Sequence, residues 1–224
     1  LYVTSNNNPK VRDGRHYVFH IGVPSEISAN ASAGYLQDKR GSKRACVLHT
    51  PRDFQIHAAA CTAKAMKERK MDVEDREIGE YPADDMQLLE EVRAWKADAI
   101  CILGSETERL AELVKTAHAL GGLPVMLHPR GLLCSEFARL TGDAAEGHEF
   151  TDIYLRNAHA PEEEKALHSY LARANSSLVA TASHGFGWDG LRLLVEAWKA
   201  AGSEADRQVE FLESLRGYSG ATGM

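Results

Sequence analysis

From about residue 44 onward, short apolar runs alternate with amphipathic stretches of helical periodicity. Arg44–His49 has the continuous apolar character of a buried strand, and the Ala-rich stretch from about 54 to 69 favours a helix. Alternating strands and helices are typical of βαβ units, so the pattern predicts an α/β fold with a mainly parallel sheet flanked by helices. The pattern predicts further strands at 72–78, 98–103, 123–127 and 150–155, and helices at 85–96 and across 110–117.

Beyond Arg156 the pattern changes to consecutive helices. Residues 161–173 open with a proline and three glutamates, which are favoured at helix N-termini. Apolar positions between 191 and 198 form a second helical face, and 206–215 forms a third. Residues 2–4 are strand-like, but no earlier segment precedes them as a partner.

Composition and charge exclude several classes of function. Hydrophobic residues make up 44% of the chain, which is enough for a buried core. The net charge of −6 gives no attraction to nucleic acid, and the apolar runs are far shorter than the roughly 20 residues that span a bilayer. We therefore expect no nucleic-acid partner and a protein that is not embedded in a membrane.

The cysteines leave the cellular compartment open. Cys46 and Cys101 lie in strand-like runs and Cys61 lies in a helical run. Buried thiols are the favoured interpretation over disulfides.

Three loops are candidates for ligand binding. Ligands of an open parallel sheet bind beyond the carboxyl ends of its strands, where loops and helix N-termini converge. The loops at 50–54, 104–107 and 128–131 follow expected strands directly, and they supply an aromatic ring, two hydroxyls and a guanidinium: Phe54, Ser105, Thr107 and Arg130. This set suits a small organic anion, because arginine can grip a carboxylate with two parallel hydrogen bonds.

Each of these side chains also has an ordinary structural interpretation. Phe54 opens a helix and can be a core anchor. Ser105 and Thr107 can cap a helix, because their oxygens can accept from free N–H groups at its start. Arg130 can be a solvated loop arginine. The sequence leaves these alternatives open.

Enzyme and metal signals are weak. The run Gly185–Gly190 fits the G-x-G-x-x-G spacing, but no second strand follows it, and Phe186 and Trp188 would crowd a pyrophosphate. His57 and Cys61 lie four apart on one helix, yet no third metal ligand follows at a recognisable spacing, so a packed pair is favoured. We expect no enzymatic activity, no cofactor and no metal.

Several segments, read in order, resemble one family. These are Tyr17–His20, Gly34–Leu36, Lys43–Leu48, Ala97–Ile100, Ala117–Gly121, Gly142–Gly147 and Glu196–Ser203. Together they resemble the branched-chain amino-acid-binding proteins, which are type I periplasmic solute-binding proteins of ABC transporters. The resemblance covers nearly all of the chain.

The resemblance implies two lobes joined by a hinge, which close around a small solute and deliver it to an ABC transporter permease. It implies a monomer located in the periplasm or otherwise outside the cytoplasm. Residues 1–20 would be a remnant of the amino-terminal lobe and hinge, 21–156 the complete carboxy-terminal lobe, and 157–224 a return segment of the amino-terminal lobe. The chain is therefore expected to be truncated at both ends. As an alternative, the same fold serves as the ligand-sensing domain of a regulator or signalling protein.

The resemblance also assigns ligand contacts. Asn6 and Asn7 fall in a segment similar to the loop that binds the amino acid's main-chain groups, although an Asn run can be simply a polar turn. Phe54 stands where the family has a tyrosine packed on the substrate. Thr107, or alternatively Glu106, stands where another aromatic residue is expected.

Arg130 is the main departure from the family. It stands where amino-acid binders place a glutamate for the ligand's ammonium group. A guanidinium there would repel an ammonium group and attract an anion, which predicts a carboxylate or another electron-rich ligand in place of leucine.

Overall fold

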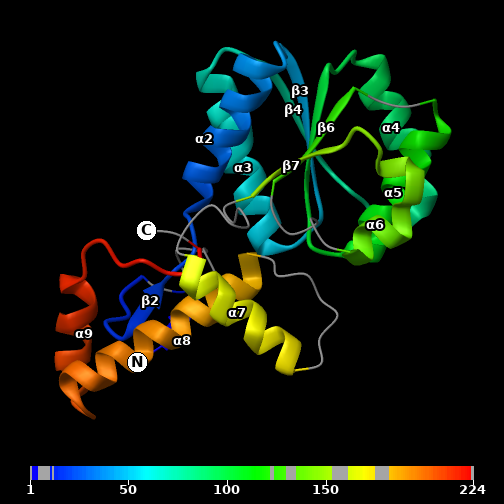
Figure 1. Cartoon of the computed structure of the whole chain (residues 1–224). Helices are drawn as coiled ribbons and strands as arrows, with labels where there is room; N and C mark the ends of the chain where they lie inside the picture. The colour runs from blue at the N-terminus through cyan, green and yellow to red at the C-terminus, as the bar shows by residue number, and fades with distance from the viewer. Residues whose placement is uncertain are drawn as a thin grey trace. The chain divides into compact units, whose positions relative to one another are not determined.

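The computed structural model describes residues 2–4, 11, 13–121, 124–129, 135–152, 161–174 and 182–222. The chain forms two compact units (Figure 1). Unit 1 combines Leu1–Val23 with Ile153–Met224, and unit 2 is the continuous segment Pro24–Asp152. These boundaries lie within a few residues of the division expected at 20 and 156. The assignment of the units to lobes stays a prediction.

Unit 2 is built on a five-stranded parallel sheet with the strand order β4-β3-β5-β6-β7. Every neighbouring pair is parallel, which confirms the α/β fold with a mainly parallel sheet. His49 at the end of β3 pairs with Glu77 of β4 and Leu103 of β5, so these three strands end together at one edge. The strands are β3 (Arg44–His49), β4 (Asp72–Glu77), β5 (Ala99–Leu103), β6 (Val125–Pro129) and β7 (Glu149–Thr151).

Helices cover both faces of this sheet (Figure 1). One face carries α2 (Ser25–Gly34), which continues into a π-helical turn at Tyr35–Lys39, and α3 (Asp53–Glu68). The other face carries α4 (Asp85–Ala94), α5 (Thr107–Ala119) and α6 (Ser135–Thr141), with short 3-10 turns at Pro82–Asp84 and Gly142–Ala145.

The two cores follow from the alternation of side chains along each strand. Ala45 and Val47 of β3 pack in the cluster with α2 and α3. Cys46 and Leu48, one position along, pack in the cluster with α4, α5 and α6. A sheet covered on both faces needs strands that are apolar throughout, which explains the continuous apolar run recognised in the sequence.

The sequence pattern did not predict two helices, α2 and α6. α2 buries Ala29 and Ala33, and the π-helical turn after it buries Leu36; spacings of four and three place these residues on one face. α6 buries Phe137 in the opposite core. Both helices are short or built from small residues, so their periodicity is weak.

Among its described residues, unit 1 contains a two-stranded parallel sheet and the three helices α7, α8 and α9. β1 (Tyr2–Thr4) pairs with β2 (Val18–His20), so the strand that lacked an earlier partner has a later one. The helices are α7 (Pro161–Arg173), α8 (Ala182–Ala201) and α9 (Ala205–Ser214).

The glycine-rich run at 185–190 lies inside α8, so it is a helix and not a phosphate-binding loop. The buried Asp189 carboxylate accepts hydrogen bonds from the backbone N–H groups of Ala221 at 2.7 Å and Thr222 at 2.9 Å. The close approach also accounts for Gly220, because a Cβ there would meet the Asp189 carboxylate at 2.5 Å. Asp189 therefore fixes the end of the described chain to α8.

Cys46 and Cys101 are fully buried free thiols, as expected. Burial raises the pKa of Cys46 to about 12, so its thiol is protonated at neutral pH. Among the described residues, no helix combines the length and the apolar character needed to cross a membrane.

Candidate functional site

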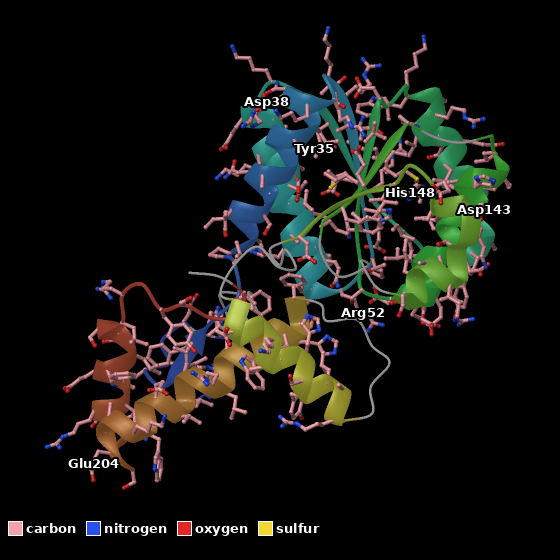
Figure 2. All side chains as sticks on the ribbon, in the orientation of Figure 1. Tyr35, Asp38, Arg52, Asp143, His148 and Glu204 are labelled. Atoms are coloured by element: carbon pink, nitrogen blue, oxygen red, sulfur yellow. The ribbon has the colours of Figure 1, made fainter. Side chains whose placement is uncertain are left out.

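The candidate site lies at the edge of the unit 2 sheet where the strands end. β3 is followed by the loop 50–52 and then α3, and β5 is followed by 104–106 and then α5. Because β3 and β5 are neighbours, the two loops are adjacent, and the Thr50 N–H donates to the Leu103 carbonyl at 3.1 Å. Figure 2 shows Arg52 at this edge, whereas Asp38 lies toward the opposite edge of the unit.

A cavity of about 200 Å³ opens at this edge. Its walls are largely apolar and come from α2, α3 and the end of β5, with hydroxyl and amide groups at its rim. The lining residues are Ser25, Ser28, Ala29, Phe54, Gln55, Ala58, Thr62, Leu103, Gly104 and Ser105. We call this the serine cavity.

Two hydroxyl oxygens in the serine cavity have no partner among the described residues. The Oγ atoms of Ser25 and Ser28 are buried and have no hydrogen-bond partner within the described part of the chain. Leaving a buried hydroxyl unsatisfied costs about 1–3 kcal/mol. These two groups are therefore poised to bind an oxygen or nitrogen of a ligand.

Phe54 and Ser105 are brought together by the fold, since both line this cavity. Phe54 is the second residue of α3 and is half-buried, so one part of its ring faces the cavity. Ser105 is exposed, and its Oγ accepts a hydrogen bond from Gln55 Nε2 at 3.0 Å. An aromatic surface next to several hydroxyls suits a small ligand with one apolar and one polar end.

Helix N-termini add a favourable field for negative charge. α2 begins at Ser25 and α3 at Asp53, and first-turn residues of both helices line the serine cavity. Neither helix has a side-chain cap hydrogen bond from its capping residue. Free N–H groups and the helix dipole at such ends favour an anionic or electron-rich group.

Glu106 is engaged within the protein. Its carboxylate accepts from Thr50 Oγ1 at 2.9 Å, Arg52 Nε at 3.0 Å and the Ser105 N–H at 3.0 Å. Partial burial opposes ionisation, but these hydrogen bonds together hold the pKa of Glu106 below its usual value. Glu106 therefore clamps the loop after β3 to the loop after β5.

Thr107 is the first residue of α5, and it lines neither the serine cavity nor the neighbouring one. The capping position of α5 is Glu106, with no side-chain cap hydrogen bond to the helix. Asn6, Asn7 and Arg130, the other residues predicted from the sequence, lie outside the described residues.

The neighbouring cavity, of about 370 Å³, is more charged. Its Arg109 donates to the buried Asp85 carboxylate, with Nη1 at 2.7 Å, and to the Gly79 carbonyl at 2.9 and 3.0 Å. Its Arg52 pairs with Glu106. We call this the arginine cavity, and both of its arginines are already engaged with groups of the protein.

Ser25, Ser28 and Gln55 were missed by sequence reasoning. Ser25 and Ser28 lie on α2, which follows no strand of the unit 2 sheet, so the rule that selects loops after strands could not find them. Their spacing of three on one helical face was the available signal.

Comparison with known proteins identifies the family and the fold. The family model for periplasmic binding proteins matches residues 1–224. The chain is similar to the leucine-binding protein LivK of Thermotoga maritima, with 24% identity and a TM-score of 0.89, covering 99% of this chain and 64% of that one. The chain thus spans about 64% of the length of that relative. A search of curated proteins finds no match.

Two further solved structures are similar. The branched-chain amino acid binding protein LivJ of Streptococcus pneumoniae, in complex with isoleucine, has 19% identity and a TM-score of 0.81, covering 99% of this chain and 63% of that one. A solute-binding protein from R. palustris, in complex with benzoate, has 18% identity and a TM-score of 0.77, covering 92% and 57%. At such identities the likeness shows the type I periplasmic binding protein fold.

Proposed function

We propose that this chain, which belongs to the periplasmic binding protein family, captures a small organic solute as the extracytoplasmic receptor of an ABC importer. The observation that carries the proposal is the serine cavity, where Phe54 lies with two buried serine hydroxyls that have no partner among the described residues. A binding protein needs such a preformed apolar pocket with a few convergent polar groups.

The proposed solute is amino acid-like or a carboxylate, and we favour a carboxylate without an amino group. The N-termini of α2 and α3 favour negative charge, and the polar groups lining the serine cavity are serine, threonine and glutamine side chains, none of them a carboxylate. The benzoate bound to the R. palustris protein is a ligand of this class.

The proposed contacts divide between the two ends of the solute. Phe54 packs on its apolar part, and Ser25, Ser28 and Ser105 donate to its oxygens. From the sequence resemblance, Asn6, Asn7 and Arg130 complete the set, with Arg130 facing the carboxylate. Glu106 and Thr107 do not contact the solute in this proposal. Glu106 holds the loops after β3 and β5 together, and Thr107 begins α5.

In this proposal residues 21–156 form the carboxy-terminal lobe, and 1–20 and 157–224 belong to the amino-terminal lobe. The monomeric receptor hands its solute to an ABC transporter permease. A receptor and a ligand sensor with this fold differ in that partner and not in the pocket. Stimulated uptake of the bound solute by permease-containing vesicles would identify a receptor; saturable binding without stimulation would favour a sensor.

The first test is a thermal-shift screen of the chain with benzoate, short aliphatic carboxylates, dicarboxylates, leucine and neutral amides, because binding to the folded state raises the melting temperature. A shift confined to carboxylates without an amino group is expected. Shifts with leucine-like amino acids would contradict the proposed charge preference.

Two variants of Phe54 link any shift to the cavity. Phe54→Leu removes the ring and should weaken binding, whereas Phe54→Tyr retains it and should bind nearly as well as the parent. Equal binding by all three proteins would exclude the serine cavity as the site.

A further inference from the structure

A group of potential metal ligands lies on the outer surface of α2 and α3. Glu26 comes from α2, and His57 and Cys61 come from α3. One ligand atom from each residue lies within 4.8 Å of the other two. Cys61 Sγ is 3.7 Å from His57 Nε2 and 3.9 Å from Glu26 Oε1.

We propose that Glu26, His57 and Cys61 form a binding site for a divalent cation of the zinc type, which links α2 to α3. Thiolate sulfur, imidazole nitrogen and carboxylate oxygen are the three ligand types that zinc takes in proteins. Around a tetrahedral zinc ion with normal bond lengths, such ligand atoms are roughly 3.5 Å apart. The two separations from Cys61 Sγ, 3.7 and 3.9 Å, are close to this value, and the ligand atoms of His57 and Glu26 lie within 4.8 Å of each other.

The helices hold the ligands in place for this role. His57 and Cys61 are four residues apart, so they lie one above the other on the same face of α3. α2 packs beside α3 (Figure 1) through the small buried side chains Ala29 and Ala33, which allow the helix backbones to approach closely. Glu26 therefore reaches the His57–Cys61 face from a firmly packed neighbour.

The charges also match a divalent ion. A thiolate, a carboxylate and a neutral imidazole together carry two negative charges, which neutralise one divalent cation. Half-burial of His57 and Cys61, with Glu26 exposed, leaves a fourth coordination position open to solvent. This is the arrangement of three protein ligands plus water that zinc adopts at open sites.

Metal binding exchanges a proton for the cation. Without the ion, the Cys61 thiol donates to the Glu26 carboxylate, with Sγ 3.9 Å from Oε1. When the ion binds, the S–H bond breaks, an S–metal bond forms and the proton leaves to solvent. Uptake of one ion therefore releases close to one proton near neutral pH.

The site is next to the serine cavity. Glu26 lies between Ser25 and Ser28 in the sequence, and His57 lies three residues after Phe54. A metal ion at this position would fix the first turns of the two helices that line the cavity. The metal site does not depend on the proposed solute, and it can be tested without one.

The test uses Co²⁺, which takes zinc sites and reports thiolate ligation through a near-ultraviolet charge-transfer band. The reduced chain is titrated with Co²⁺, Zn²⁺ is then added as competitor, and proton release is measured by calorimetry in two buffers. We expect one Co²⁺ per chain with a thiolate band, displacement by Zn²⁺, and an increased melting temperature with either ion.

Ligand variants decide the assignment. Loss of an outer partner of a zinc ligand typically weakens binding 10–100-fold, so Cys61→Ser, His57→Gln and Glu26→Gln should each weaken it by at least about 100-fold, and Cys61→Ser should abolish the thiolate band. His118→Gln removes an exposed helical histidine of α5 and should change nothing. Metal-free melting temperatures of the variants establish that each is folded.

Three results would overturn the proposal. The first is no thiolate band in the parent protein, and the second is a band that persists in Cys61→Ser. The third is full metal affinity in Glu26→Gln, which would leave only a surface His–Cys pair without the link between helices.

Discussion

The serine cavity and the arginine cavity both border the loop after β5, yet they differ in how far their polar groups are engaged. In the arginine cavity, Arg109 is bonded to Asp85 and Gly79, and Arg52 to Glu106. In the serine cavity, the hydroxyls of Ser25 and Ser28 are buried without a partner in the described part of the chain. The larger and more charged cavity is therefore the one with less left to offer a ligand.

This difference shows that charge alone is a poor guide to a binding site. Paired charges already have their hydrogen bonds, so a ligand would have to break them to bind. Unsatisfied hydroxyls lose nothing when a ligand arrives, because their desolvation has already been imposed by folding. We infer that the arginine cavity mainly stabilises the edge of the sheet, whereas the serine cavity is available for recognition.

The largest effect on stability is expected from breaking the Arg109–Asp85 ion pair. Asp85→Ala leaves the guanidinium of a largely buried arginine unpaired, so the free energy of unfolding should fall by about 3–5 kcal/mol. Denaturant unfolding measures this free energy. Glu136→Ala, which breaks the exposed Arg139 pair, is the control and should leave the free energy of unfolding nearly unchanged, because solvent screens that pair. A similarly small decrease in the free energy of unfolding of both variants would contradict a structural role for the arginine cavity.

The second prediction concerns another buried polar atom without a partner among the described residues, His128 Nδ1. Burial, and then His148, lowers the pKa of His128 to about 3. Unfolded His128 binds a proton below about pH 6.5, whereas folded His128 does not until about pH 3. Its contribution to stability is therefore complete above pH 6.5 and decreases as the pH falls toward 3, by up to about 1.4 kcal/mol per pH unit.

His128→Phe tests this pH dependence, because a phenyl group keeps the ring contacts with Phe137 and Phe150. The substitution also removes the hydrogen bond between His128 Nε2 and His148 Nδ1 at 2.9 Å. Melting temperatures of the variant should fall less steeply between pH 6.5 and 4 than those of the parent. An unchanged slope in His128→Phe would assign the acid sensitivity to other groups.

The third prediction extends the comparison to a charge expected at the serine cavity. If Arg130 grips the solute carboxylate, Arg130→Ala should weaken binding of that carboxylate by about 1.5–3 kcal/mol, the range for hydrogen bonds to charged groups. Titration calorimetry with the best carboxylate from the screen measures it. An unchanged dissociation constant would show that Arg130 does not contact the solute.

The smallest effect separates binding from stability. Replacing Ser25 and Ser28 together by alanine removes two unpartnered hydroxyls, so folding stability should be unchanged or slightly higher while solute binding weakens by about 1–2 kcal/mol. Ser203→Ala, an exposed serine between α8 and α9, is the matched control and should affect neither. A clear loss of stability in the double variant would mean that the hydroxyls already have structural partners.

Much of unit 2 could be predicted from the sequence because its strands are covered on both faces. Arg44–His49 was predicted with the bounds of β3, and the strand at 98–103 differs from β5 by one residue. A continuous apolar run between loops carries enough local information to identify such strands. α2 was missed because its buried face is made mainly of alanines, which differ little from their neighbours in hydropathy.

The candidate site was predicted only in part. Phe54 and Ser105 could be found because they directly follow strands, and strand ends meet at one edge of a parallel sheet. Glu106 lies in a loop found by the same rule but was selected as a contact only through the family resemblance. Its hydrogen bonds to Thr50 and Arg52 give it a clamping role that spacing cannot reveal. Ser25 and Ser28 come from a helix outside the rule.

The sequence by itself determined the α/β class and most of the alternating strands and helices of unit 2, because these depend on local periodicity and on the geometry of parallel strands. The tertiary structure alone decided which polar groups are satisfied and which are not, and it placed Glu26 beside His57 and Cys61. Such pairings depend on distances between side chains far apart in the sequence, which packing fixes and which no local pattern encodes.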